Sequence, residues 1–179
     1  MRYVVVSILK GEAGDFNNSL RKEVWQKFKA KSSKLPAHFT IKAPFEQEGE
    51  ISELEMVLEE FCKKEKTEFF RINGYDHFDD RVIFMKVDMS NEAKAIHDRL
   101  IDKMRLLSYI DFTKNDGKDK TFHVTVTSKK LSSIYSEVWE YVNSYPCEFE
   151  GCSFDNISIF KWEDNTWKLY REFRLREDL

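Results

Sequence analysis

Two short segments of the chain share the pattern His-x-Thr-x. The first is His38-Phe39-Thr40-Ile41 and the second is His123-Val124-Thr125-Val126. Both lie in stretches where polar and apolar residues alternate, which is typical of a strand with one buried face. In each segment the histidine and the threonine therefore share a face, about 7 Å apart along the strand, while the residue between them points into the core.

Two histidines and two threonines can together act on a phosphoester. Displacement at phosphorus needs a base at the attacking oxygen and an acid at the leaving oxygen, on opposite sides of the phosphorus atom. Two facing histidines can take both roles near neutral pH, because an unperturbed imidazole has a pKa of about 6.5. A threonine hydroxyl beside each histidine can donate a hydrogen bond to a non-bridging phosphate oxygen. This chemistry requires a fold that brings the two segments face to face.

Hydrophobic periodicity predicts the elements that would position these segments. We expect strands at residues 3–9, 37–43, 67–73, 81–87, 122–127, 158–162 and 167–175, and helices at 15–31, 52–62, 91–107 and 131–142. Ser52 and Glu55 predict a capping box at the second helix, with Ile51 packed against Met56. Asn73-Gly74 is expected to end the third strand, and residues 113–120 are expected to form an exposed loop.

The predicted order of elements indicates an internal duplication. A β-α-β-α-β unit is followed by a second such unit and a closing strand, and His38 and His123 are about 85 residues apart. No linker-like segment separates the halves. We therefore expect an α+β fold in which 1–179 is a single bilobal domain, with pseudo-repeats at about 1–75 and 80–179. Mostly antiparallel sheets would line a central groove, with the helices outside and the two motifs facing each other.

Composition excludes several classes of protein. The chain has 29 Lys+Arg against 32 Asp+Glu, a net charge of −3, which argues against sequence-independent duplex binding. A hydrophobic content of 41% and an aromatic content of 15% predict a packed core. No apolar run approaches the roughly 18 residues of a membrane helix, and no secretory signal is evident. Cys62, Cys147 and Cys152 lack metal-ligand spacing, so we expect free thiols and a cytoplasmic protein without a membrane partner. The oligomeric state stays open, with a monomer as the default.

The other two histidines have simpler explanations than catalysis. His77 lies in a polar stretch that predicts a turn, and His97 adjoins the buried stripe of a helix. A metal site built from His77 with Asp76, Asp79 and Asp80 is an alternative, but contiguous turn residues seldom converge on one ion.

Several lysines could attract an anionic substrate. They precede the first motif at Lys27, Lys29, Lys31 and Lys34, and the second at Lys114, Lys118 and Lys120. Framing a groove, they could draw in a nucleotide or an RNA end; otherwise they are solvated surface charges. Lys42 shares the face of His38 by strict alternation, so it is the better candidate for binding phosphate. Phe45 and Phe78 could stack on a base, although core packing is the default for a phenylalanine.

These motifs resemble those of the two-histidine (2H) phosphoesterase superfamily, which includes 2′-5′ RNA ligase-like proteins and cyclic nucleotide phosphodiesterases. Residues 35–46 are similar to the first motif of its small bacterial YjcG-like branch, and residues 78–87 and the terminal hairpin with Trp167 also match. The resemblance covers essentially the whole chain. It implies that His38 and His123 are the acid–base pair, that Thr40 and Thr125 bind phosphate, and that neither a metal nor a cofactor is needed.

The second motif departs from the family pattern at its flanks. Thr121-Phe122 precede His123 where many members have a proline, and residues 127–130 contain lysines where RNA-ligase-like members often have an arginine. We expect a metal-independent phosphoesterase that hydrolyses, or reversibly ligates, a cyclic phosphate or 2′-5′ phosphodiester of a nucleotide or RNA end. The alternative is a non-catalytic module that binds nucleotide or RNA phosphate in the same groove. Which histidine is the acid and which the base stays open.

Overall fold

A computed structural model describes residues 1–178 of the chain. Its helices are α1 (Gly11–Phe28), α2 (Ser52–Lys64), α3 (Asn91–Met104) and α4 (Tyr135–Asn143), the last preceded by a 3₁₀ turn at Ser132–Ile134. Its strands are β1 (Arg2–Ile8), β2 (His38–Glu46), β3 (Glu68–Phe78), β4 (Val82–Met89), β5 (His123–Thr127), β6 (Glu148–Phe154), β7 (Asn156–Glu163) and β8 (Thr166–Arg174).

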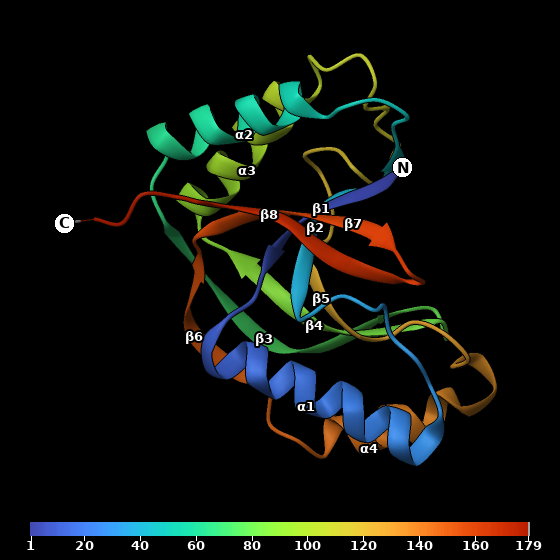
Figure 1. The fold of residues 1–179 in the computed structure, drawn as a ribbon. Coiled ribbons are helices and arrows are strands. Elements are labelled where there is room, and N and C mark those ends of the chain that lie inside the picture. The colour runs from blue at the N-terminus through green and yellow to red at the C-terminus, as the bar shows by residue number, and fades with distance from the viewer. Residues whose placement is uncertain (179) are drawn as a thin grey trace.

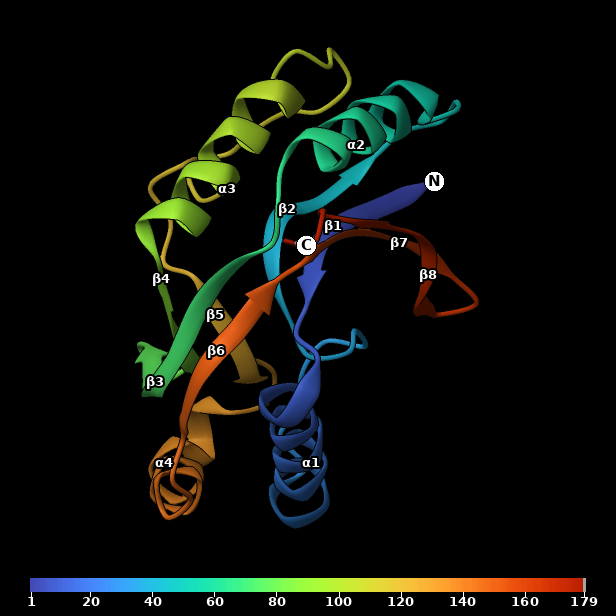
Figure 2. The same cartoon turned by 90° about the vertical axis from the view of Figure 1, so that its left-hand side faces the viewer.

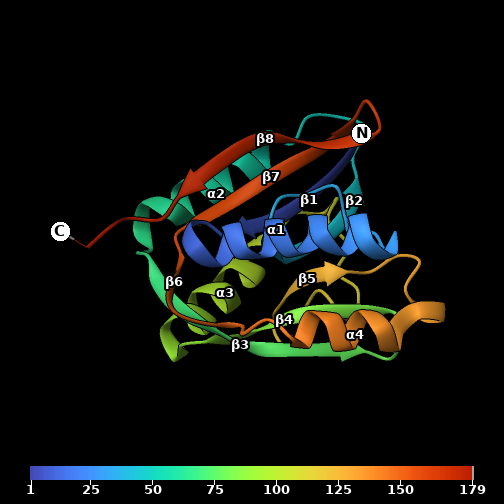
Figure 3. The same ribbon diagram turned by 90° about the horizontal axis from the view of Figure 1, so that it is seen from below.

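The strands form two four-stranded sheets, and every pairing within them is antiparallel. The first sheet has the order β2-β1-β7-β8 and the second β5-β4-β3-β6. Seen from below, the sheets form separate layers with α1 and α4 on the near side (Figure 3). The α+β class and the two antiparallel sheets predicted from the sequence are confirmed. Each sheet also contains strands from both halves of the chain, because β7 and β8 extend the first sheet beside β1 and β3 joins the second sheet beside β4.

The helices lie in two pairs at opposite ends of the molecule, α1 beside α4 and α2 beside α3 (Figures 1 and 2). The core joins the two sheets: the Phe39 ring of β2 meets the rings of Phe70, Phe122 and Phe154 in edge-to-face contacts at 5.3–6.0 Å. The residue between His38 and Thr40 is thus buried as predicted. None of the helices within residues 1–178 combines the length and apolar composition needed to cross a membrane.

Several predicted elements differ from the observed ones in their limits, and one strand was missed. The second repeat closes with β6, which sequence analysis missed because Glu148–Phe154 is largely exposed and contains Gly151 at φ +62°. β3 continues past Asn73-Gly74 to Phe78, because Gly74 at φ +78° accommodates a bulge between Ile72 and Tyr75 rather than a turn. α1 begins at Gly11 and ends at Phe28, four and three residues before its predicted limits.

The predicted capping box of α2 is also absent. Ser52 is the first residue of the helix, the N-cap is Ile51, and no side chain caps the helix. Ile51 is buried, but Met56 is 59% exposed and makes no staple with it. The helix forms instead through its apolar face, with Leu54, Leu58 and Phe61 buried.

A β-bulge in β2 turns Lys42 into the protein interior. Thr40 pairs with Val6 whereas Lys42 pairs with Val5, so β2 carries one residue more than β1 across this interval, and Ile41 and Lys42 are both buried. The Lys42 ammonium is 2% exposed and donates to Asp116 Oδ2 at 2.9 Å and to the Ala43 carbonyl at 3.0 Å. A buried cation needs such a partner, because an unpaired charge in the interior is strongly unfavourable.

Asp116 attaches the long loop before β5 to β2. Its carboxylate, 3% exposed, accepts hydrogen bonds from the Ala43 amide (3.0 Å), the Thr113 amide (3.1 Å) and the Thr113 hydroxyl (2.8 Å) in addition to Lys42. Although burial opposes ionisation, these donors hold the pKa of Asp116 below its usual range. The loop at 113–120, predicted to be exposed, is therefore fixed by one fully buried side chain.

We predict that Asp116→Ala lowers the free energy of unfolding by about 3–5 kcal/mol, because it leaves the Lys42 ammonium buried without a counter-charge. The measurement is urea denaturation followed by circular dichroism. The matched control is Asp119→Ala, which removes an exposed carboxylate of the same loop and should change stability by about 0.5 kcal/mol or less. Equal stability of the two variants would contradict a structural role for the buried pair.

Candidate active site

The two motifs open two strands that lie side by side. His38 is the first residue of β2 and His123 the first residue of β5, and these end strands of the two sheets contact each other. His38 and Thr40 are both half-buried, as are His123 and Thr125, whereas the residues between them are buried. His123 and Thr40 line one cavity of about 880 Å³. The fold thus brings parts of both motifs to a common space.

Both catalytic candidates are oriented by the same local contact. Nδ1 of His38 lies 2.7 Å from the Pro36 carbonyl oxygen, and Nδ1 of His123 lies 2.8 Å from the Thr121 carbonyl oxygen. A carbonyl only accepts hydrogen bonds, so each Nδ1 carries the proton. The neutral ring then has an unprotonated Nε2, which can take a proton as a base or, once protonated, give it back as an acid.

Burial makes both histidines weaker bases than free imidazole. It lowers the pKa of His38 to about 4, against the opposing effect of the Pro36 carbonyl, and the charges of Arg21 and His123 lower it further. The pKa of His123 is also lowered, by burial first and then by the Lys120 charge, against the Thr121 carbonyl. The contribution of His123 to the shift of His38 indicates that the two rings are close enough for a charge on His123 to disfavour a charge on His38.

Aromatic side chains pack against His123 of the second motif. The rings of Phe78 and Phe84 lie 5.2 Å and 5.1 Å from the His123 ring, so Phe78 contacts the catalytic candidate itself. Phe45, the other phenylalanine suggested to stack on a base, is 8% exposed and packs against Tyr3 at 5.9 Å. Phe45 is therefore a core residue, whereas Phe78 remains available to the cavity that it lines.

The structure removes Lys42 from the phosphate-binding candidates. The prediction that it shares the face of His38 assumed strict alternation, and the bulge in β2 breaks that alternation. Its ammonium is held by Asp116 in the interior instead. Lys120 is the better candidate: it lines the cavity with His123, its Nζ donates to the Ile41 carbonyl at 2.5 Å, and burial lowers its pKa to about 8.

Sequence analysis missed Arg21 of α1. Its guanidinium donates to Ser32 Oγ at 2.8 Å and to the carbonyls of Ser33 and Leu35 at 2.8 and 2.7 Å, so it fixes the segment that leads into the first motif. It also lies near enough to His38 to lower the pKa of that histidine. An arginine one position after a buried helix residue carries no sequence signal of such a role.

The structure confirms the predicted position of His97 beside the buried face of a helix, but not the predicted turn at His77. His97 is fully buried and packs edge-to-face on Phe122 at 4.7 Å, and burial lowers its pKa to about 4. His77 lies near the end of β3 rather than in a turn, lines the cavity of His123, and contacts Trp139 at 5.1 Å. Within residues 1–178, no three His, Cys, Asp or Glu side chains are grouped so as to hold a metal ion.

Comparison with known proteins places this arrangement in a family. The model of the 2′-5′ RNA ligase superfamily matches residues 15–166. The chain belongs to this superfamily of two-histidine phosphoesterases. It is 26% identical to a candidate phosphoesterase of Bacillus pumilus (strain SAFR-032), over 99% of each chain. A second candidate phosphoesterase, from Geobacillus kaustophilus (strain HTA426), is 20% identical over 97% of this chain and 95% of its own.

Solved structures support the same fold. The protein TT0787 of Thermus thermophilus superimposes with a TM-score of 0.67 over the full length of both chains, at 15% identity. LigT of E. coli, complexed with 3′-AMP, superimposes with a TM-score of 0.58 over 97% of this chain and 96% of its own, at 11% identity. Membership of the superfamily indicates an enzyme of the phosphoesterase or RNA-ligase-like class.

We predict that both motif histidines titrate below pH 6.5 in the free protein, with His38 near pH 4. The measurement is a pH titration of the imidazole signals by nuclear magnetic resonance, assigned with His38→Ala and His123→Ala. Adding inorganic phosphate should raise both pKa values, because a bound anion stabilises the imidazolium. A His38 signal that titrates at 6.5, or that ignores phosphate, would contradict this description of the site.

Proposed function

We propose that this protein is a metal-independent phosphoesterase that hydrolyses a cyclic phosphate or a 2′-5′ phosphodiester of a nucleotide or RNA end. The observation that carries the proposal is the paired geometry of His38 and His123. Each opens one of two adjacent strands, donates from Nδ1 to the carbonyl two residues before it, and keeps Nε2 for proton transfer. Two such groups are what an in-line displacement at phosphorus needs, one at each reacting oxygen.

The surroundings of the two histidines support one division of their roles in hydrolysis. Burial, together with the Arg21 charge, lowers the pKa of His38 to about 4, so this ring is unprotonated at neutral pH and can act as the base on water. His123 then protonates the leaving ribose oxygen. An anionic substrate between the rings would raise the pKa of His123 toward neutrality and supply the proton that the free site lacks. In the ligation direction, a hydroxyl would replace water as the nucleophile, with His38 as the base on the entering oxygen and His123 as the acid on the leaving oxygen.

The non-bridging phosphate oxygens would be held by hydroxyls and one ammonium. Thr40 and Thr125 follow their histidines by two residues and are half-buried, so each hydroxyl can donate to a bound oxygen. Lys120 lines the cavity with Thr40 and would supply the positive charge that was expected of Lys42. A nucleobase attached to this phosphate could stack on the Phe78 ring. The complex of LigT with 3′-AMP supports a nucleotide as the ligand of such a groove.

We predict that His38→Ala and His123→Ala each lower turnover of a 2′,3′-cyclic nucleotide by about 10²–10⁴-fold, the usual contribution of one acid or base group. Both should keep the wild-type circular dichroism spectrum, because each ring is half-buried rather than part of the core. Wild-type activity should persist in EDTA, because the proton transfers are assigned to imidazoles. Near-full activity of either variant, or activity lost to EDTA and restored by one metal, would refute the mechanism.

The same variants separate the acid from the base. A nitrophenolate leaving group needs no proton, so with bis(p-nitrophenyl) phosphate His123→Ala should regain much of its activity while His38→Ala should not. The opposite pattern would exchange the two assignments.

We predict that Thr40→Val and Thr125→Val lower kcat by about 10²–10³-fold without unfolding the protein. Valine keeps the β-branched shape but removes the hydroxyl, and loss of one oxyanion donor costs about 2.7–4 kcal/mol of transition-state stabilisation. Steady-state kinetics give the decisive readout. A rise in KM with kcat unchanged would show that the hydroxyls bind ground state and transition state alike. Unchanged kcat/KM would show that they do not touch the substrate.

A further inference from the structure

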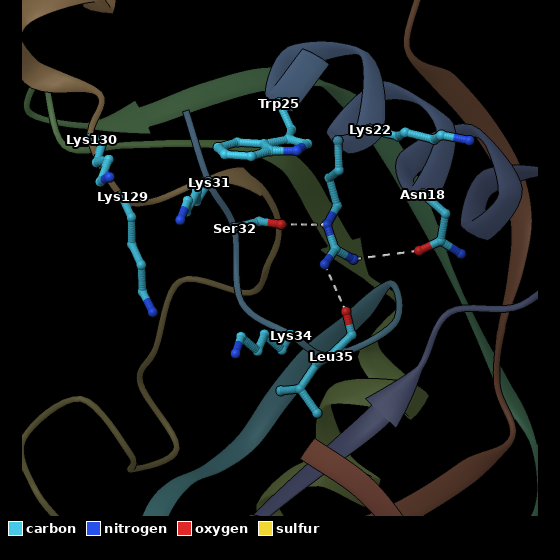
Figure 4. A pocket seen from close by; sticks show the side chains of 10 residues that line it. Asn18, Lys22, Trp25, Lys31, Ser32, Lys34, Leu35, Lys129 and Lys130 are labelled. Atoms are coloured by element: carbon cyan, nitrogen blue, oxygen red, sulfur yellow. Dashed lines mark hydrogen bonds between the residues drawn. The ribbon is translucent and has the colours of Figure 1, made fainter. Parts of the chain in front are cut away.

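A second cavity, of about 720 Å³, has a strongly basic lining. We call it the basic pocket, and it is lined by Asn18, Arg21, Lys22, Trp25, Lys31, Ser32, Lys34, Leu35, Lys129 and Lys130. Six of these side chains are cationic and none is acidic. Figure 4 shows Lys31 and Lys34, from the segment between α1 and β2, and Lys129, from the segment after β5, extending toward the same space, with the Trp25 ring at its edge.

The cations of the basic pocket are not neutralised by the protein. Within residues 1–178, none of the six forms an ion pair with a carboxylate, although most other parts of the surface pair their lysines and arginines with Asp or Glu. In a chain with a net charge of −3, such a cluster is a local exception. Unpaired like charges that line one cavity create a positive potential that an anionic ligand would relieve.

The basic pocket is joined to both catalytic motifs. Lys31 and Lys129 exchange backbone hydrogen bonds, and the Thr127 hydroxyl donates to the Lys31 carbonyl at 2.9 Å. One wall therefore comes from the segment that enters β2 at His38, and another from the segment that leaves β5 after Thr125. Arg21 links the two sites electrostatically, since it lines the pocket and its charge lowers the pKa of His38.

Trp25 gives the basic pocket an aromatic surface. Its side chain is 40% exposed, and the ammonium groups of Lys29 and Lys31 lie 5.1 Å and 4.9 Å from the centre of its ring. An exposed indole that already binds cations through its ring can stack on a nucleobase when these ammonium groups turn from the ring to the neighbouring phosphates. An acidic peptide would use the lysines but would leave this ring without a matching group.

We propose that the basic pocket binds the single-stranded RNA that continues from the reacting phosphate, with one base stacked on Trp25 and the backbone against Lys31, Lys34 and Lys129. The inference rests on the proposed function, which places the reacting phosphate between His38 and His123. It makes the natural substrate an RNA chain rather than a free mononucleotide, since the basic pocket and the cavity at His123 share no lining residue and a ligand must extend to contact both.

The test compares binding of an eight-nucleotide RNA that ends in a 3′-phosphate, followed by fluorescence anisotropy, among variants of the pocket. Trp25→Ala should weaken binding about tenfold, and Trp25→Phe should largely restore it. Lys31→Ala with Lys129→Ala should lower the slope of log affinity against log salt by about 1.4, the value for two lost contacts to a single strand. The control, Lys64→Ala with Lys103→Ala, removes two exposed lysines on α2 and α3 and should bind like the wild type.

Turnover gives a second and separate readout. The ratio of kcat/KM for an RNA with a 2′,3′-cyclic phosphate end to kcat/KM for the cyclic mononucleotide should fall about tenfold in Trp25→Ala. Wild-type affinity in both pocket variants would overturn the proposal, and so would displacement of the RNA by polyglutamate as readily as by polyuridylate. If the wild type binds the RNA through the pocket but hydrolyses no cyclic phosphate, the proposed function fails while the basic pocket stands.

Discussion

The ion pair between Lys42 and Asp116 holds together the two parts of the site that the chain supplies separately. A bulge turns Lys42 into the interior, and a cation there requires a carboxylate. That carboxylate comes from the loop before β5, which it ties to β2 through Ala43. The loop continues through Lys120, whose ammonium binds the Ile41 carbonyl, to His123. The position of the second motif relative to the first thus depends on one buried charge that has no part in the chemistry.

Symmetry in the backbone and asymmetry in the charges explain how two similar motifs can act differently. The two histidines make the same Nδ1–H contact with a carbonyl two residues earlier, so their rings start with the same tautomer. Their surroundings then diverge, because Arg21 acts on His38 whereas Lys120 acts on His123. Acid–base catalysis needs one protonated and one unprotonated group at the same pH, and different burial and different neighbouring charges can separate two pKa values without changing residue type.

Sequence patterns predicted the features that local residue spacing determines, namely the helices and most of the strands. They missed the features that depend on contacts with residues distant in the sequence. Alternation around His38 and His123 gave both strands and the buried Phe39, and helical periodicity gave all four helices. Alternation failed at Lys42, because a bulge is set by pairing with β1 and leaves no mark in β2 itself. Gly74 was ambiguous, since a glycine at positive φ serves a bulge as well as a turn. Asp116 and Arg21 carried no signal, because their partners are 74 and 11–14 residues away.

The positive charges of Arg21 and Lys120 have two effects at the site. They lower the pKa values of the nearby histidines, and they attract an anionic phosphate. In the free protein, burial and then the charges of Arg21 and Lys120 lower the pKa values of His38 and His123, so both rings are unprotonated at neutral pH. The same charges favour the entry of a phosphate, whose negative charge then offsets them and stabilises an imidazolium. Protonation of the acid is thereby coupled to occupancy of the groove. In the proposed mechanism, the site therefore becomes competent for proton transfer only when the anionic substrate is bound.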